Sequence, residues 1–414
     1  MLLSESEKNS LLERFLKYVK VWTTSDSQSA DQNIQPSTQR QFDLANILKD
    51  ELNQLGLQDV QITEKCYVYG FLPASTGMET KPAFALLAHM DTVEEVSGEN
   101  VNPQIVKKYS GQVIELNCGV RLDPATDAAL AEAAKNGETI IHTDGTTLLG
   151  ADDKAGVAAI MEALVYFKNH PETKHSAIEV IFSPDEETGH GMDNVPLNLL
   201  KSKHAYTVDG GHIGELEIEC FNAFKSEIFF EGVSTHTGTA RGKLVNAVTM
   251  ASSFVSNLPK HLSPETTDGY QGFISPMSVE GTLESAKVNL ILRDFTKPGM
   301  EEKKSLVDSI AQTTAKIFGG KVKVIHTQQY INMKEGFDKN PEVVENLIKA
   351  YKKAGVEPVF TPIRGGTDGS RLTEMGIPTP NIFTGGHNYH SRNEWCSLEQ
   401  MCSACEILIN LGSN

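Results

Sequence analysis

The residues of this chain that can do chemistry gather in a few short stretches. The first is His89-Met90-Asp91, which follows an apolar, strand-like run at Ala83–Ala88. Side chains two apart on a strand point the same way, so His89 can bind a metal through one ring nitrogen while Asp91 accepts a hydrogen bond from the other. A surface loop is the alternative interpretation of this pair.

Two further stretches carry adjacent carboxylates. Asp152 and Asp153 precede a helix-like segment, where they can cap the helix or supply a carboxylate that bridges two cations. Three consecutive carboxylates lie within Ser183–Gly189, directly after a strand-like run at Ala177–Phe182. Open α/β sheets place their sites at the carboxyl ends of strands, so one carboxylate here can bind a metal while its neighbour acts as general base. A solvated acidic turn is the alternative.

The last stretches add one carboxylate and more histidines. Asp209 follows a short strand-like run, with His212 close behind it. Far downstream, a glycine-containing loop carries His387 and His390, and either can be a ligand. Carboxylate and imidazole ligands without cysteine suit zinc, with manganese or cobalt as chemical substitutes. Five such ligands, one of them bridging, are what two cations about 3.5–4 Å apart need, with a shared water between them.

The elements that must position these residues alternate between strand and helix. Strand-like runs lie at Ala83–Ala88, Ala177–Phe182 and Ala205–Val208, and Lys154–Lys168 has helical spacing. This alternation predicts an α/β fold whose mixed sheet has helices on both faces. Near the N-terminus, Ser37 or Thr38 is expected to cap a helix that ends near Gly56.

The pattern changes after Gly211. Residues 215–231 alternate like antiparallel strands, and more strands and helices are expected at 243–258, 288–293, 300–318 and 321–325. These elements predict a smaller α+β module inserted into the first domain. Helical character returns at Asn340-Pro341 and runs to Gly355. We therefore expect a discontinuous catalytic domain of residues 1–219 and 334–414 and a lid-like domain of residues 220–333.

Composition narrows the class of protein. The formal net charge is −17, which argues against nucleic acid or an anionic membrane as a partner. The N-terminus has no secretory pattern, no apolar run reaches the length of a membrane span, and cysteines are sparse. We therefore expect a cytoplasmic protein. Cys402 and Cys405, in a helix-like segment, are core or surface thiols or, alternatively, a redox or metal pair.

Six segments of the chain closely resemble peptidase T. They are, in order, LLAHMDT, TLLGADDKAG, FSPDEETG, YTVDGG, IRGGTDGS and NIFTGGHNYHS. Peptidase T is a family of cytoplasmic tripeptide aminopeptidases in the clan of co-catalytic zinc exopeptidases with a lid or dimerisation domain. The resemblance covers essentially the whole chain. It implies a small peptide as substrate and two Zn²⁺ per subunit, replaceable by Co²⁺ or Mn²⁺, and it leaves a homodimer open.

The resemblance also assigns metal ligands. It implies that His89 and Asp209 hold one zinc and that Glu187 and His390 hold the other. Asp152 would bridge the two ions, and its peptide bond to the next aspartate would be cis. The implied ligand in the downstream loop is His390 and not His387, because the family ligand is the histidine just before the small residue.

Further roles follow from the same resemblance. Glu186 would be the general base that deprotonates the bridging water and later protonates the leaving amine, and Asp91 would orient a ligand histidine. His236 matches a lid histidine that steadies the oxyanion, although Thr237 replaces the proline common in the family. Arg293 matches the arginine that receives the free carboxylate of the peptide. The alternatives are a strand-end histidine and a surface arginine.

The remaining expectations concern specificity. Arg364 is a further candidate for lining the substrate cleft, and residues 111–141, which look less family-like, can reshape its rim. The implied activity is removal of the N-terminal residue from tripeptides. A related dizinc dipeptidase, carboxypeptidase or amino-acid deacylase is the nearest alternative, because these enzymes share the metal ligands. A catalytically silent binding protein is disfavoured, because every ligand and Glu186 are present.

Overall fold

The computed structural model describes residues 2–414 and divides them into two units. The first unit comprises the residues up to Ile218, Gly336–Thr361 and Thr367–Asn414, and the second comprises Glu219–Glu335 and Pro362–Gly366. The sequence placed 334–414 wholly in the first domain, whereas the structure groups Pro362–Gly366 with the second unit. The reason is a long-range contact: Ile363 forms a parallel β-bridge with Cys220.

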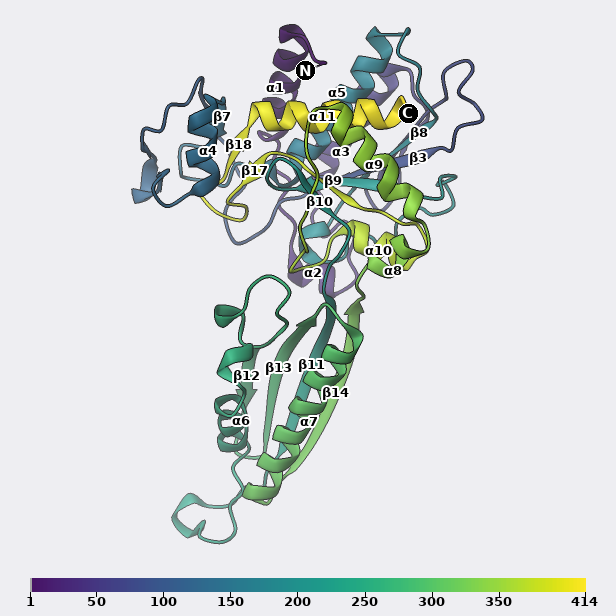
Figure 1. Ribbon diagram of the computed structural model, residues 1–414. Coiled ribbons are helices and arrows are strands. Elements are labelled where there is room, and N and C mark those ends of the chain that lie inside the picture. The colour runs from purple at the N-terminus through teal and green to yellow at the C-terminus, as the bar shows by residue number, and fades with distance from the viewer. Residues whose placement is uncertain (1) are drawn as a thin grey trace. The chain divides into compact units, whose positions relative to one another are not determined.

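A mixed sheet is the frame of the first unit (Figure 1). Within residues 2–414 it has eight strands, in the spatial order β1 (Gln58–Ile62), β2 (Val68–Leu72), β8 (Ile178–Ser183), β3 (Phe84–His89), β9 (Ala205–Gly210), β16 (Asn381–Phe383), β10 (Glu215–Glu217) and β15 (Val359–Phe360). Strands β8, β3, β9 and β16 run parallel, β2 pairs antiparallel with β1 and β8, and β10 pairs antiparallel with β16 and parallel with β15. The predicted mixed α/β class is confirmed.

The central strands are apolar because both faces of the sheet are covered. Every residue of β3 and β8 is buried. On one face α5 (Ala151–Asn169) packs against β3 and β9. On the other face, Leu87 of β3 belongs to a core cluster with Met192 and with Leu372 of α10 (Asp368–Glu374).

Other helices complete the first unit, and α3 corrects one expectation. They are α1 (Glu5–Tyr18), α2 (Ser27–Asp31), α3 (Gln41–Leu55), α4 (Ala128–Asn136), α9 (Pro341–Lys353) and α11 (Leu398–Gly412), with α8 (Lys334–Asp338) at the junction of the units. Neither Ser37 nor Thr38 caps α3, which has no side-chain cap. Tertiary contacts take both hydroxyls: Ser37 donates to Asp185, and Thr38 donates to the carbonyl of Thr24. As expected, the helix ends at Gly56, which has φ +87°.

Residues 104–142 form a small structure at one side of the first unit. Strands β4 (Gln104–Val106) and β7 (Ile140–His142) join β17 (Gly386–His387) and β18 (Trp395–Ser397) in a second sheet, and β5 (Ile114–Glu115) pairs with β6 (Arg121–Leu122). Trp395 is fully buried there against Leu122, Leu130 and Ile140. The less family-like segment 111–141 therefore has its own core.

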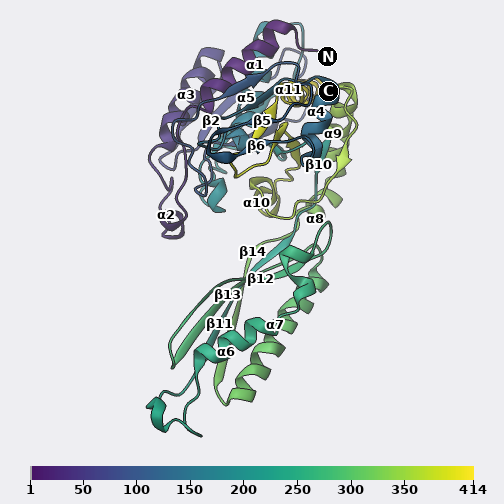
Figure 2. The same cartoon turned by 90° about the vertical axis from the view of Figure 1, so that its left-hand side faces the viewer.

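The second unit is an antiparallel sheet with two helices on one face (Figure 2). Its strand order is β12 (Phe273–Gly281), β13 (Ser285–Asp294), β11 (Asn222–Glu231) and β14 (Lys321–Tyr330), and its helices are α6 (Ala247–Ser256) and α7 (Lys297–Phe318). The run 215–231 is not one set of paired strands, because β10 joins the sheet of the first unit. The edge strand β12 was not predicted: half of it is exposed, including Met277 and Val279.

Among the described residues no helix combines the length and the apolar character needed to cross a bilayer.

The short 3₁₀ segments are Asn117–Gly119, Glu186–Thr188, Thr237–Thr239, Lys260–Leu262 and Pro264–Thr266.

Candidate metal centre

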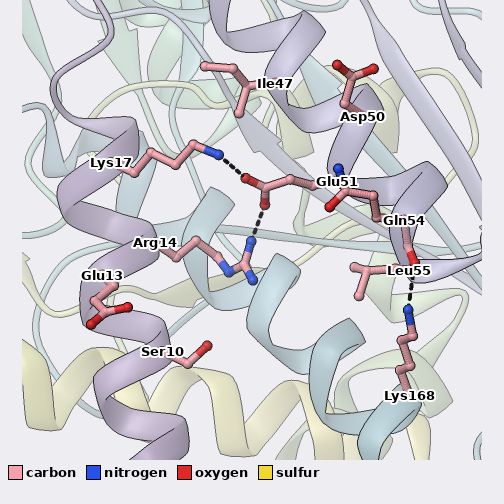
Figure 3. A pocket seen from close by; sticks show the side chains of 10 residues that line it. All are labelled: Ser10, Glu13, Arg14, Lys17, Ile47, Asp50, Glu51, Gln54, Leu55 and Lys168. Atoms are coloured by element: carbon pink, nitrogen blue, oxygen red, sulfur yellow. Dashed lines mark hydrogen bonds and ion pairs between the residues drawn. The ribbon is translucent and has the colours of Figure 1, made fainter.

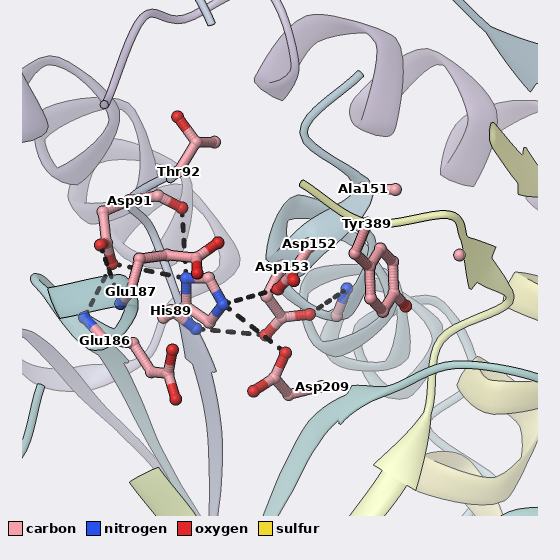
Figure 4. A network of polar contacts seen from close by, with 12 residues as sticks. His89, Asp91, Thr92, Ala151, Asp152, Asp153, Glu186, Glu187, Asp209 and Tyr389 are labelled. Atoms are coloured by element: carbon pink, nitrogen blue, oxygen red, sulfur yellow. Dashed lines mark hydrogen bonds and ion pairs between the residues drawn. The ribbon is translucent and has the colours of Figure 1, made fainter. Parts of the chain in front are cut away.

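Three parallel strands bring their carboxyl ends to one edge of the large sheet. His89 is the last residue of β3, and Asp209 lies near the end of β9. Glu186 and Glu187 lie in the 3₁₀ turn that follows β8. Figure 4 shows the side chains of His89, Glu187 and Asp209 around Asp152, which comes from the start of α5, with the Glu186 side chain on the His89 side of the cluster. Parallel pairing of β8, β3 and β9 is therefore what gathers residues that are far apart in sequence.

His89 faces two carboxylates across the site. Its Nε2 lies 2.9 Å from Oδ1 of Asp152 and 3.5 Å from Oδ1 of Asp209. Its other ring nitrogen, Nδ1, lies 3.2 Å from the carbonyl oxygen and 3.4 Å from Oδ1 of Asp91. Asp91 thus fixes the ring so that Nε2 points into the cluster.

His390 faces the other side of Asp152. Its Nε2 lies 2.9 Å from Oε2 of Glu187 and 3.3 Å from Oδ2 of Asp152. His387 lies elsewhere: its ring stacks on Trp395 at 4.0 Å, and its Nε2 faces Gln400 at 3.3 Å. The downstream loop therefore contributes His390 to the cluster, and His387 packs in the interior.

The donor set fits two cations. Ligand atoms about 2.0–2.1 Å from a tetrahedral ion lie about 3.3 Å from one another. The distances of 2.9–3.5 Å within His89–Asp152–Asp209 and of 2.9–3.3 Å within Glu187–His390–Asp152 match that spacing. Asp152 directs one oxygen toward each histidine, which is the arrangement a bridging carboxylate needs. The Asp152–Asp153 peptide bond is cis, as the resemblance implied.

Asp91 also holds the turn that carries the two glutamates. Its Oδ1 accepts the backbone N–H of Glu186 at 3.0 Å, and its Oδ2 accepts that of Glu187 at 3.2 Å. The third carboxylate of this stretch, Asp185, is buried and accepts hydrogen bonds from Ser37 and Gln41. Hydrogen bonds to Asp91 on one side and from Ser37 and Gln41 on the other therefore fix the acidic turn. Of its three carboxylates, those of Glu186 and Glu187 are directed into the site (Figure 4).

The electrostatics of the cluster follow from crowded carboxylates. Burial raises the pKa of Glu187 to about 8 and that of Asp209 to about 6. Hydrogen bonds to Asp152 and Glu187 raise the pKa of His390 to about 11. Burial opposes the charged form of His89, but the adjacent carboxylates, Asp209 first, hold its pKa well above the ordinary value. Without cations, protons on these groups balance the negative charge, and cations can replace those protons.

Glu186 differs from its neighbour in having a free carboxylate. Among residues 2–414 the structure gives its side chain no hydrogen bond and no ion pair, although the backbone N–H is held by Asp91. Burial and the carboxylates of Asp209, Asp368 and Glu187 raise the pKa of Glu186 well above its ordinary value, against the opposing effect of His89. A half-buried, unpaired carboxylate beside a cation site is placed to accept a proton.

Three further buried acids belong to this region, of which the sequence raised only Asp153, as a helix cap or a bridging carboxylate. Asp153 accepts the backbone N–H groups of His89 and Gly156, and its carboxylate lies close enough to Asp209 to form a second candidate ligand group with His89. Asp368 accepts a 2.5 Å hydrogen bond from Ser183. Glu394 is also buried beside the site. A long-range hydrogen bond leaves no local sequence signal, although Asp153 and Asp368 lie within the segments TLLGADDKAG and IRGGTDGS.

The remaining predicted residues belong to the second unit. His236 is exposed, and its Nδ1 accepts the N–H of Gly238 at 3.1 Å. Arg293 lies on β13, donates through Nη1 to the Leu292 carbonyl at 3.0 Å, and packs over Tyr330. Arg364 donates to the carbonyls of Gly269 and Gln271 and to the hydroxyl of Thr267. Arg364 therefore stabilises the 267–271 loop of its own unit.

Two other features of the first unit carry no cation site. A surface pocket of about 740 Å³ lies among α1, α3 and α5 (Figure 3), but its cations are already paired: Arg14 and Lys17 with Glu51, and Lys168 with the Gln54 carbonyl. Cys402 and Cys405 are buried on α11, and burial raises the pKa of both thiols. They pack as core thiols, which favours the first of the two interpretations.

The sheet, the helices on its two faces and the His/Asp/Glu cluster at the strand ends define a metal-dependent hydrolase fold, and comparison with known proteins agrees. The model of peptidase family M20/M25/M40 matches residues 142–413. The chain therefore belongs to this family of metallopeptidases. Within the family it is 46% identical to Peptidase T of Clostridium perfringens over 400 residues, covering 96% of this chain and 97% of the relative, which places it in the peptidase T group.

Solved structures show the same fold. An aminopeptidase from Bacillus cereus superposes with a TM-score of 0.75 at 24% identity, and the match covers 98% of both chains. A dinuclear metal-binding M20 peptidase from Bacillus subtilis superposes with a TM-score of 0.66 at 14% identity, covering 99% of this chain and 98% of the other. At these sequence identities the structural similarity is evidence for the fold alone.

Proposed function

We propose that this protein is an aminopeptidase that removes the N-terminal residue from tripeptides with the help of two divalent cations. One observation carries the proposal: Asp152 directs Oδ1 at His89 and Oδ2 at His390, and the free carboxylate of Glu186 lies within the electrostatic reach of His89 and Asp209. A bridging carboxylate between two nitrogen–oxygen ligand sets, next to an unpaired base, suits hydrolysis better than structural metal binding.

The cation ligands divide into two sets that share Asp152. His89 and Asp209 would hold one ion, and Glu187 and His390 the other. When bound, two zinc ions supply a water of lowered pKa and positive charge for the oxygen of the scissile carbonyl, and cobalt or manganese can substitute. Asp91 keeps Nε2 of His89 directed at the first ion through its contact with Nδ1.

Glu186 is the proposed general base and general acid of the reaction. Its carboxylate takes a proton from the attacking water and later delivers it to the nitrogen of the leaving amine, so the base of the first step is the acid of the second. The backbone of Glu186 is fixed by Asp91, while no hydrogen bond or ion pair among residues 2–414 holds its carboxylate.

Two side chains of the second unit have groups that can bind a peptide. Because Nδ1 of His236 accepts a hydrogen bond, its Nε2 carries the proton in the neutral ring and can donate to an oxyanion. Arg293 uses Nη1 for backbone carbonyls, and the rest of its fork can bind a peptide carboxylate. We propose no direct substrate contact for Arg364, because its guanidinium donates hydrogen bonds to the 267–271 loop.

A peptide panel tests the proposal. The purified protein, loaded with zinc or treated with a chelator, is given an unblocked tripeptide, the matching dipeptide and tetrapeptide, and the N-acetylated tripeptide. We expect metal-dependent release of the N-terminal residue from the free tripeptide alone. Cleavage of the dipeptide or of the acetylated peptide would instead assign the protein to a sister activity, a dipeptidase or deacylase. No cleavage with metal bound would indicate a silent binding protein.

The compartment and the assembly belong to the same proposal. The six cysteines all lie within the described residues and are free thiols. Because disulfides are rare in a reducing compartment, we propose the cytoplasm. We propose a homodimer as the assembly, and light scattering on the purified protein tests it by measuring the mass.

A further inference from the structure

A buried carboxylate joins the two segments that carry Asp152 and His390. Glu394 follows the His390 loop and is 1% exposed. Its Oε2 accepts the backbone N–H groups of Leu149 and Gly150 at 2.7 and 2.9 Å. Its Oε1 accepts those of Ala151 and Asp152 at 2.7 and 3.2 Å. A single side chain thus satisfies the consecutive N–H groups at the start of α5.

Gly150 occupies the N-cap position of α5 with φ +79° and offers no side-chain cap. Asp152 and Asp153 depart from helical dihedrals, and Asp153 accepts the N–H of Gly156 at 3.1 Å, further along the helix. The N–H groups of Leu149 to Asp152, before that point, are the ones that Glu394 accepts. The first N–H groups of a helix need partners, and a buried one left unpaired is costly. Charge-assisted bonds to a carboxylate are stronger than bonds to a neutral acceptor. Glu394 therefore fixes the backbone of this turn from a distant point in the chain.

We propose that Glu394 is a positioning residue of the metal centre, which sets the separation of Asp152 from His390. The Asp152 N–H is one of its partners, so the bond constrains the residue that offers an oxygen to both histidines. Only three residues separate Glu394 from His390, so the same side chain anchors the loop of the second histidine. This inference rests on the proposed metal ligands and adds a residue that touches neither cation nor substrate.

The substitution Glu394→Gln tests this role with little change in volume. The amide keeps one oxygen as acceptor but turns an NH₂ group toward two backbone N–H donors, so half of the cap is lost. Glu179→Gln is the matched control. Glu179 is also buried, and its carboxylate accepts the backbone N–H groups of Lys201 and Ser202, but it lies at the opposite end of β8 from the site.

The readout is cation binding, not turnover. Cation-free wild type and both variants are titrated with Zn²⁺ against a chelating indicator and with Co²⁺ followed by its visible absorption, and their thermal unfolding is recorded without metal. We expect both variants to unfold at lower temperature. Glu394→Gln should weaken Zn²⁺ binding about 10–100-fold and shift the Co²⁺ bands, and Glu179→Gln should bind within about twofold of wild type.

The outcomes separate the two proposals. If wild type binds two cations and Glu394→Gln binds them as tightly, or if both variants are weakened equally, the positioning role is overturned and the proposed function stands. If wild type binds no cation, that result contradicts both the proposed function and the positioning role of Glu394. If Glu394→Gln does not fold, Glu394→Asp replaces it: the charge is kept but the reach is shorter, and unchanged affinity in that variant overturns the role.

Discussion

Nε2 of His390 lies 2.9 Å from Oε2 of Glu187, although one residue sits in a loop near the C-terminus and the other in the turn after β8. Neither residue has the other in its sequence neighbourhood, and only the fold brings them together. The contact completes a ligand set whose other member, Asp152, is shared with His89.

Removing the proposed base should abolish turnover and spare metal content. Glu186→Ala is expected to lower kcat about 10²–10⁴-fold, because positioned proton transfer contributes that much. Elemental analysis of the purified variant should still find both cations, because Glu186 is not among their proposed ligands. Glu99→Ala, at an exposed position, is the control and should behave as wild type. A Glu186→Ala enzyme with most of its activity intact would contradict the assigned role.

The bridging carboxylate should matter to both cations. Asp152→Ala is expected to lose both ions, since each ligand set includes one Asp152 oxygen, whereas His390→Ala should lose mainly the ion shared with Glu187. Calorimetric titration with Zn²⁺ counts the ions and their affinities. His387→Ala is the matched control, because that ring stacks on Trp395 and should affect stability alone. Full binding of two ions by Asp152→Ala would exclude the bridge.

Cation binding should release protons and strengthen as pH rises. The pKa of His390 is raised to about 11, so its ring is protonated at neutral pH without metal and must lose that proton to act as ligand. Apparent affinity should therefore increase with pH from neutral toward 11. Calorimetry in buffers of different ionisation enthalpy measures the release. His390→Ala should release fewer protons than wild type, and equal release would contradict the assignment.

The same pKa has a consequence for the metal-free fold. Its value lies above that of an unfolded histidine, so the ion pairs of His390 stabilise the metal-free protein fully below about pH 6.5 and are lost as pH rises toward 11. The metal-free protein should thus lose stability at high pH, and bound zinc should reverse that trend. Chemical denaturation at several pH values, with and without zinc, tests the sign.

Arg293 should discriminate between peptides by their C-terminal group. Arg293→Ala is expected to lower kcat/KM for a free tripeptide about 10–100-fold, and to change the rate for the corresponding tripeptide amide much less. Arg364→Ala should instead destabilise the 267–271 loop and lower both rates alike, because its bonds go to that loop. Steady-state kinetics on the peptide pair separates the two arginines. Equal losses on both peptides for Arg293→Ala would remove it from carboxylate recognition.

The sequence by itself determined the strands that carry the site. The apolar runs that became β3, β8 and β9 are buried on both faces, and such strands leave a clear local pattern. Because each run is followed by a histidine or carboxylate, His89, Glu187 and Asp209 could be proposed as partners before their distances were known. Local periodicity sufficed there because the determinant is short-range.

Only the tertiary structure decided the contacts that join distant segments. The hydroxyls of Ser37 and Thr38 look like helix caps in sequence, yet they serve Asp185 and the Thr24 carbonyl. Pro362–Gly366 belongs to the second unit because Ile363 forms a β-bridge with Cys220. Glu394, near the C-terminus, accepts the N–H of Ala151 at the start of α5. Each of these is a hydrogen bond or β-bridge between groups with no fixed sequence spacing. Such pairings are chosen by the packed fold, because burial penalises every donor left without a partner.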